Sequence, residues 1–411
     1  MTVEIRTVEH DELPAWQAAM RVGFHQPRAD AGRDRAWLDQ WAEEVDWARI
    51  HGAFDDGRVV ATYRSFATAL TVPGGEVAAD AITNITVSPT HRRRGVLSTL
   101  VAADLAAAAE RGDAVAILIA SEYPIYGRYG FGPATDIADY MVDPRRARFA
   151  RGGAGEPRLV SPEELVAAAK EVYDVHRRAT PGAIERAGRW WERRVGVALA
   201  PRDPPATQHC VVAYDERGAA AGVLVYHVEE GWEQWLPRAT LHVGELFAVS
   251  PEVEARLWRY ACEVDLVATV HAEQRGVEEG LPWLLADARA VRASLLSDFL
   301  WVRLLDVPAA LGARTYPRAG DMVFEVRDAL GYAAGRYALR AGPDGAAECS
   351  PTQAEPDVAV DVGALSAAYL GGRSLATLAA AGWADERRPG ALARADAMLR
   401  TPVAPWCATL F

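Results

Sequence analysis

The spacing of hydrophobic residues in the first part of the chain changes from helical to strand-like. Apolar residues recur at helical spacing over 12–24 and 33–45, and Trp37 and Trp41 fall on one face of the second helix. Short apolar runs then flank Asp55-Asp56-Gly57, a typical hairpin turn. This order predicts a mixed α/β (α+β) domain, with the tryptophans in its core rather than in a pocket wall.

Part of this pattern recurs in the middle of the chain. Apolar runs at 211–214 and 220–228 flank a turn, and a strand over 241–249 ends in Val-Ser-Pro before a helix over 252–264. The first domain has the same order, because Val-Ser-Pro at 87–89 comes between a strand and a helix. We therefore expect a second copy of the first fold, joined to it by a glycine-rich linker at 149–157.

A third group of elements follows from residue 301. Expected strands at 321–327, 335–340 and 357–361 precede expected helices at 362–370, 375–381 and 389–399. Because 411 residues are too many for one hydrophobic core, several domains are expected. The predicted domains are 1–148, 158–300 and 301–411.

Composition narrows the class of protein further. No apolar run is long enough to cross a bilayer, and the first residues lack the pattern of a secretion signal. The four cysteines are scattered, with neither metal-ligand spacing nor the density of a disulfide scaffold. A cytoplasmic protein with no membrane partner and no metal is expected.

The net charge of −12 argues against a nucleic-acid partner, since a nucleic-acid binder needs a basic face. An acidic protein attracts cations, so the charge weakly favours a multiply charged amine as ligand.

The most informative segment is 85–97, Ile-Thr-Val-Ser-Pro-Thr-His-Arg-Arg-Arg-Gly-Val-Leu. A strand, a short turn and an arginine-glycine loop lead into an alanine-rich helix. The first amides of a helix lack intrahelical partners, and Gly95 lets an anion approach the backbone. The arginines add charge and planar donor groups. The alternative is a charged surface loop that only caps the helix.

Residues 92–97, Arg-Arg-Arg-Gly-Val-Leu, resemble the pyrophosphate-binding signature R/Q-x-x-G-x-G/A of the GCN5-related N-acetyltransferases (GNAT). Leu97 departs from it, because a second small residue is common there. Downstream, Tyr-Gly-Arg-Tyr-Gly-Phe at 126–131 resembles the tyrosine segment after the family's fifth strand. Tyr126 matches the family's general acid; the alternative is an aromatic hairpin that packs on the core.

This resemblance implies acetyl-CoA as co-substrate and a set of residues around it. The backbone at 85–87 would bond the pantetheine and the thioester carbonyl, and the loop would hold the pyrophosphate. Ser121 and Glu122 would line the channel, or else only cap a loop. The candidate cofactor-binding residues are Ile85, Thr86, Val87, Arg92, Arg93, Arg94, Gly95, Val96, Leu97, Ser98, Ser121 and Glu122.

The second copy lacks this loop. Glu252 and Glu254 stand where the first copy has its arginines, and their charge would repel a pyrophosphate. A degenerate, non-catalytic GNAT-like domain is expected.

The order of all three domains resembles the Eis (enhanced intracellular survival) family, bacterial N-acetyltransferases known for acetylating aminoglycosides. The run Arg-Trp-Trp-Glu-Arg-Arg at 189–194 and the segment at 361–372, which looks like a sterol-carrier fold, carry this resemblance. It implies a homohexamer and a general base formed by the C-terminal carboxylate, which matches Phe411.

Several alternatives stay open at this point. Glu122 could be the base instead, and the apolar end of the chain could merely seal the third domain. The protein could also be a lipid or sterol carrier with a vestigial acetyltransferase fold. A third possibility is an enzyme that acetylates protein lysines.

Overall fold

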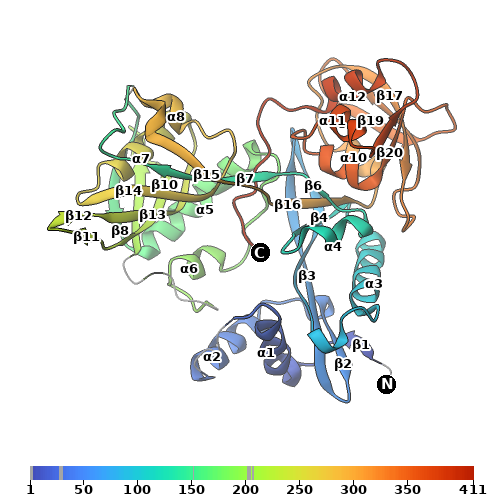
Figure 1. The fold of residues 1–411 in the computed structure, drawn as a ribbon, viewed down its shortest axis with the longest axis horizontal. Coiled ribbons are helices and arrows are strands. Elements are labelled where there is room, and N and C mark those ends of the chain that lie inside the picture. The colour runs from blue at the N-terminus through green and yellow to red at the C-terminus, as the bar shows by residue number, and fades with distance from the viewer. Residues whose placement is uncertain (1–2, 27–30, 151, 201–204, 206–207) are drawn as a thin grey trace. The chain divides into compact units, whose positions relative to one another are not determined.

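The computed structural model describes residues 3–26, 31–150, 152–200, 205 and 208–411 (Figure 1). The chain forms two compact units, and both are discontinuous in sequence. The first contains residues 1–135, 299–403 and 410–411, and the second contains 136–298 and 404–409.

The first unit is built on a seven-stranded sheet in which β4 and β5 are parallel and the other neighbours are antiparallel. In spatial order the strands are β1 (Glu4–Thr7), β2 (Ile50–Asp55), β3 (Arg58–Val72), β4 (Gly75–Val87), β5 (Val115–Ile119), β16 (Leu300–Leu304) and β6 (Gly132–Pro133).

Helices cover both faces of this sheet. Adjacent residues of β2 point to opposite sides, so Phe54 packs with α1 (Leu13–Gly23) and α2 (Ala31–Ala42), while Ala53 packs with α3 (Val96–Arg111). The short helix α4 (Tyr123–Tyr126) follows β5. Trp37 and Trp41 are buried beside α1, which confirms that they are core residues.

Two strands differ from the expected domain boundaries at 148 and 301. β7 (Asp136–Val142) pairs with strands of the second sheet, although its residues were expected in the first domain. β16 lies between β5 and β6 of the first sheet, although its residues were expected to begin the third domain. Both strands are short and mostly apolar, so their sequence indicates burial but not the sheet in which they are buried.

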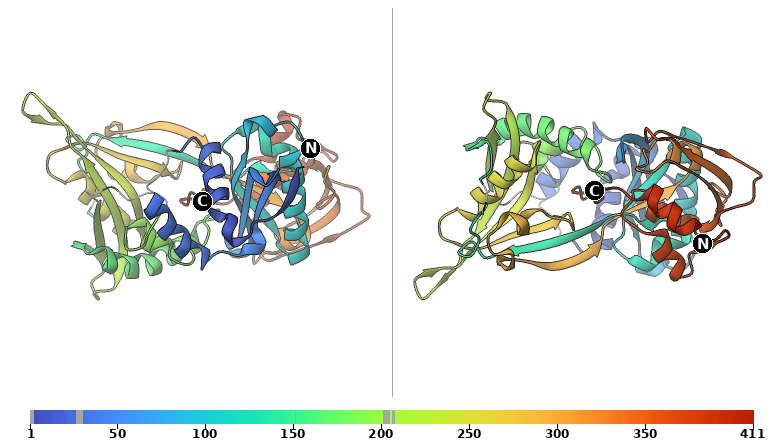
Figure 2. Two further views of the ribbon diagram at one scale, coloured as in Figure 1. Left: turned by 90° about the horizontal axis from the view of Figure 1, so that it is seen from below. Right: turned by 90° about the horizontal axis from the view of Figure 1, so that it is seen from above.

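The second unit contains another seven-stranded sheet, in which β13 and β14 are the parallel pair. In spatial order the strands are β15 (Val291–Asp298), β7, β14 (Val267–Arg275), β13 (Ala239–Ala248), β10 (Ala220–Glu229), β9 (Gln208–Tyr214) and β8 (Glu156–Val160). A hairpin of β11 (Trp232–Glu233) and β12 (Leu236–Pro237) extends beyond this sheet (Figure 2).

Helices cover both faces of the second sheet as well. On one face Trp258 of α7 (Pro251–Cys262) packs with Leu246, and on the other Tyr173 of α5 (Pro162–Ala179) contacts Phe247. The unit also contains α6 (Trp190–Arg194) and α8 (Leu281–Leu284).

The remaining part of the first unit has a five-stranded sheet, drawn in orange and red in Figure 1. Its strands are, in spatial order, β19 (Ala347–Pro351), β18 (Gly335–Ala341), β17 (Gly320–Arg327), β20 (Val358–Asp361) and β21 (Ala384–Glu386). Its helices are α9 (Val307–Gly312), α10 (Val362–Ala368), α11 (Leu375–Ala380) and α12 (Ala391–Leu399).

This part packs directly on the first sheet through two glycines. A Cβ atom on Gly132 of β6 would overlap the carbonyl oxygen of Gly363 in α10. Glycine at both positions therefore lets the backbones of β6 and α10 touch.

Candidate active site

The first sheet opens between its two parallel strands. β4 and β5 pair from Ala79–Val115 to Ile82–Leu118, but β4 continues to Val87 without β5. The register of β4 against β3 also shifts beside Asn84, whose φ is +53°. This bulge bends the end of β4 and leaves its β5-facing edge unpaired.

The three candidate backbone residues of β4 do not point the same way. The Ser88 N–H donates to the Val60 carbonyl at 2.8 Å, and hydrogen bonding alternates along antiparallel strands. Thr86 therefore bonds towards β3, where its Oγ1 also lies 2.7 Å from Thr62 Oγ1. Val87, the next residue, presents its backbone to the open edge.

The helix after this opening begins with bare amides. The first intrahelical bond runs from the Thr99 N–H to the Gly95 carbonyl at 3.0 Å, so the amides of Val96, Leu97 and Ser98 precede it. Gly95 is the N-cap with φ +83°, and it offers no side chain to satisfy them. A Cβ atom there would meet no other atom within 4 Å. The start of α3 is thus an open cradle of N–H donors.

The arginines of the loop directly precede this cradle in the chain. Arg92, Arg93 and Arg94 are exposed, and Arg93 adopts the left-handed conformation with φ +62°. Arg92 Nε donates to the Val87 carbonyl at 3.3 Å, which ties the loop to the end of β4. Three guanidinium groups beside bare helix amides are the donor set that a pyrophosphate requires, so the residues present fit coenzyme A.

Tyr126 lies at the end of α4, in the core between the sheet and α3. Burial, followed by the charge of Glu122 and the nearby Tyr129, raises the pKa of Tyr126 to about 12. The neighbouring Tyr129 hydroxyl lies 2.9 Å from the Ser98 Oγ at the start of α3. The phenol of Tyr126 is therefore protonated at neutral pH and can donate a proton.

The other two candidates, Ser121 and Glu122, are exposed after β5. Glu122 is the N-cap of α4, but its side chain makes no capping hydrogen bond, which leaves the capping alternative without support.

A buried ionic cluster behind these residues was not expected from the sequence. Asp104 of α3 accepts from the Tyr63 hydroxyl and the Ser65 hydroxyl, each at 2.8 Å. Asp80 of β4 bonds Arg49 at 2.5 Å, and burial followed by the charge of Asp104 raises the pKa of Asp80 to about 8. One indication of this cluster was present in the sequence: Asp80 and Asp104 each stand as a single acid within an alanine-rich run.

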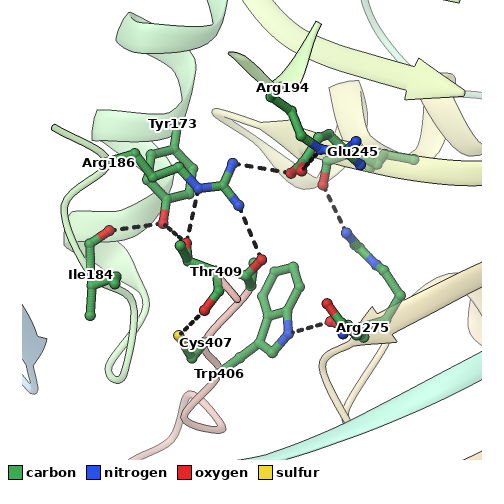
Figure 3. A network of polar contacts seen from close by, with 12 residues as sticks. Tyr173, Ile184, Arg186, Arg194, Glu245, Arg275, Trp406, Cys407 and Thr409 are labelled. Atoms are coloured by element: carbon green, nitrogen blue, oxygen red, sulfur yellow. Dashed lines mark hydrogen bonds and ion pairs between the residues drawn. The ribbon is translucent and has the colours of Figure 1, made fainter. Parts of the chain in front are cut away.

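The end of the chain is docked on the second unit (Figure 3). The Trp406 N–H donates to the Pro181 carbonyl at 2.8 Å, and its indole nitrogen donates to the Gln274 carbonyl at 2.9 Å. Arg186 donates to the Ala408 carbonyl at 3.1 Å and to Thr409 Oγ1 at 2.9 Å.

Two residues further on, the terminal side chain belongs to the first unit. The ring of Phe411 contacts Phe66 of β3 edge to face, with ring centroids 5.5 Å apart. Phe66 pairs with Ala81 of β4, close to where β4 separates from β5.

In the second sheet, the opening that matches the β4–β5 gap is filled. Pairing of β13 with β14 ends at Val243–Ala272, and Arg275 then donates to the Leu246 carbonyl at 2.8 Å. Arg275 also pairs with Glu254 of α7 at 3.1 Å and with Glu279 at 2.9 Å. In the second sheet the Arg275 side chain therefore occupies the position that is open in the first sheet.

Comparisons with known proteins agree with this architecture. Models of the acetyltransferase (GNAT) domain match residues 4–134 and 182–304, and a sterol carrier protein domain matches 307–408. The chain is therefore an N-acetyltransferase with two GNAT folds and a sterol-carrier domain, which confirms the predicted fold class.

Comparison with similar whole chains shows to which family of N-acetyltransferases this chain belongs. An uncharacterised N-acetyltransferase of Streptomyces avermitilis is 43% identical, over 100% of this chain and 99% of its own. N-acetyltransferase Eis of Mycobacterium tuberculosis is 35% identical over 81% of both chains. The crystal structure of Eis1 from Mycobacterium abscessus has a TM-score of 0.85 at 32% identity and covers both chains fully. The chain belongs to the Eis family.

Within the part of the chain that the structure describes, no helix combines the length and apolarity needed to cross a membrane.

Proposed function

We propose that this enzyme transfers acetyl from acetyl-CoA directly to an amine of a small polycationic acceptor, aminoglycoside-like in its chemistry. The observation that supports the proposal is the opening between β4 and β5, together with the unpaired amides at the start of α3 and the buried phenol of Tyr126, which shares a core cluster with Ile82 of β4 and Val96 of α3. The net charge of −12 supports a cationic acceptor.

The proposed cofactor-binding residues are those expected from the sequence, but the structure suggests different roles for individual members. The amides of Val96, Leu97 and Ser98 hold the pyrophosphate together with the loop arginines. Ile85 and Val87 provide backbone groups at the open edge of β4, whereas Thr86 fixes β4 to β3 through its bond with Thr62. Ser121 and Glu122 border the same opening.

Acetyl-CoA supplies the acetyl group as a thioester. The N–H of Val87 polarises the carbonyl oxygen of that thioester. The amine nitrogen forms a bond to the carbonyl carbon, and the carbon–sulfur bond breaks. Tyr126 gives its proton to the departing thiolate sulfur and is later reprotonated from water.

The proton of the attacking amine goes to the carboxylate of Phe411, directly or through a water. An α-carboxyl group has a pKa of about 3.3–3.7, so it is ionised at neutral pH. One observation within the first unit supports this role: the ring of Phe411 contacts Phe66 of β3, the strand that pairs with β4.

We further propose that the second GNAT fold is non-catalytic, because Arg275 fills its opening. We also propose a homohexamer, from the family resemblance, and a cytoplasmic location, from the four scattered cysteines, which have neither metal-ligand spacing nor the density of a disulfide scaffold.

The acceptor class can be tested by following coenzyme A release with matched amines. We expect a polyamino sugar to be acetylated at a higher kcat/KM than a monoamino sugar or a lysine-containing peptide. The preference should weaken at high salt, because screening removes the attraction of a polycation. A preference for the peptide would overturn the proposed acceptor and favour a protein lysine acetyltransferase.

A further inference from the structure

Three histidines stand side by side on three neighbouring strands of the second sheet. In the strand register, His227 of β10 is opposite His242 of β13, and His242 is opposite His271 of β14. The rings of His227 and His242 stack with centroids 4.7 Å apart, and those of His242 and His271 are 5.5 Å apart. Because direct cross-strand partners share one face, all three imidazoles converge.

Carboxylates join the histidines on this face. Glu273 lies two residues after His271, and its Oε1 is 3.6 Å from His271 Nδ1. Glu229 lies two residues after His227 and is 3.3 Å from His242 Nε2. One ligand atom each from His242, His271 and Glu273 lies within 4.8 Å of the others.

These groups line a cavity and not a packed core. The cavity has a volume of about 310 Å³, and its walls include all three histidines, Glu273 and Arg194. The alternate residues of β13, Leu241 and Val243, point to the opposite face and form the core with α7. The histidines are only partly buried, so an ion can reach them from solvent.

The charges around the rings act on a bound cation in opposite directions, and the pKa of the His227 imidazole is shifted. Burial, the neighbouring His242 and the charge of Arg194 lower the pKa of His227, so that ring is neutral at physiological pH. The charge of Arg194 opposes a cation, but Arg194 Nε pairs with Glu245 at 2.7 Å. Glu273 and Glu229 place negative charge beside His271 and His242.

We propose that His242, His271 and Glu273 form a binding site for a divalent transition-metal ion of the Zn²⁺ type, with His227 as a fourth candidate ligand. Two imidazoles and a carboxylate are a donor set that suits Zn²⁺. The site lies outside the acetyl-transfer chemistry. Its ion links β13 to β14, the parallel pair of the second sheet.

The test is metal binding by the full-length protein after treatment with a chelator. Equilibrium dialysis against ZnCl₂ at pH 7.5 should show one bound Zn²⁺ per chain in the wild type. This binding should be lost in His242→Ala and in His271→Ala. We expect the affinity to fall by more than the roughly 10–100-fold typical of losing an outer-shell partner. His209→Ala is the matched control, because His209 lies on β9 of the same sheet but stacks on Tyr226, which points into the core.

A second measurement guards against misfolded variants. Glu273→Gln changes an exposed side chain and should unfold at the wild-type temperature without metal, yet lose most of the increase in Tm that Zn²⁺ gives to wild type. Unchanged affinity in His242→Ala, or an equal loss in His209→Ala, would overturn the site.

Discussion

The hydroxyl of Thr409 accepts a hydrogen bond from Arg186 Nε at 2.9 Å, two residues before the end of the chain. Arg186 is itself buried and paired with Glu245 at 3.1 Å, and the Tyr173 hydroxyl lies 3.1 Å from the same Thr409 oxygen. One hydroxyl thus joins the terminal segment to a buried ionic network of the second unit.

Thr409→Val should loosen the terminal segment while keeping its shape. Loss of the hydroxyl leaves the buried Arg186 Nε without its partner, which costs about 1–3 kcal/mol. We expect kcat to fall by about tenfold or more while the affinity for acetyl-CoA is kept. Hydrogen exchange of the last residues should rise in parallel. Thr409→Ser keeps the hydroxyl and should behave as wild type. A normal kcat in Thr409→Val would mean that docking of the terminal segment does not contribute to catalysis.

Adding two glycines after Phe411 keeps every side chain but moves the terminal carboxylate. If that carboxylate is the base, the extended protein should bind acetyl-CoA normally and lose most of the roughly 10²–10⁴-fold that a general base contributes. Phe411→Leu is the control, because it keeps the carboxylate and removes only the ring contact with Phe66. Steady-state kcat and calorimetry with acetyl-CoA separate the two effects. Normal turnover in the extended protein would make Glu122 the leading candidate.

Tyr126→Phe removes only the proposed proton donor. Since Tyr126 is buried and its pKa is raised to about 12, the phenol is protonated throughout the neutral range, and its loss should lower kcat towards the 10²–10⁴-fold range. Acetyl-CoA affinity should change little. Tyr123→Phe is the matched control on the same short helix, because the Tyr123 side chain is mostly exposed. If both variants keep full kcat, Tyr126 serves only packing.

Local patterns in the sequence predicted much of the first domain. The turn at Asp55-Asp56-Gly57, the loop before α3 and the helix itself form where the spacing of apolar residues and glycines placed them. These features depend on neighbours in sequence, so a single segment contains the necessary information. The family resemblance supplied the order of domains, which the comparisons confirm.

Features that depend on distant partners could not be predicted. β7 lies in a different sheet from the preceding β6, and β16 lies in a different sheet from both β15 and β17, because strand pairing is decided by the whole core. His227, His242 and His271 are far apart in sequence and meet only through strand register. The same holds for Arg275, which enters the opening of the second sheet from β14.

His176 should make the docking of the terminal segment sensitive to acid. Its ring packs among Tyr173, Phe247 and Trp406, and burial, then the charges of Arg275 and Arg186, lower its pKa to about 3. The unfolded chain binds this proton below about pH 6.5, whereas the folded protein does not until about pH 3. Stability therefore falls as pH drops through this window.

The comparison variant is His176→Phe, which keeps an aromatic ring and removes the titration. The wild-type free energy of unfolding should decline by up to about 1.4 kcal/mol per pH unit more steeply than that of the variant between pH 6 and 4. Denaturant unfolding at several pH values measures both slopes. Parallel slopes would mean that His176 accepts a proton in the folded state.

Gly95→Glu should abolish acetyl-CoA binding, and the chain provides a matched control at the other end of the same helix. Gly95 and Gly112 are the two caps of α3, with φ of +83° and +82°, and a Cβ atom at either would meet nothing within 4 Å. Gly112→Glu therefore introduces the same backbone strain and the same charge, but away from the bare amides at the start of the helix. Because a carboxylate at position 95 would itself take those amides and repel a pyrophosphate, calorimetry should show no measurable binding for Gly95→Glu. Gly112→Glu should bind normally despite a lower Tm, and equal losses in both variants would mean that strain, not the anion site, causes the defect.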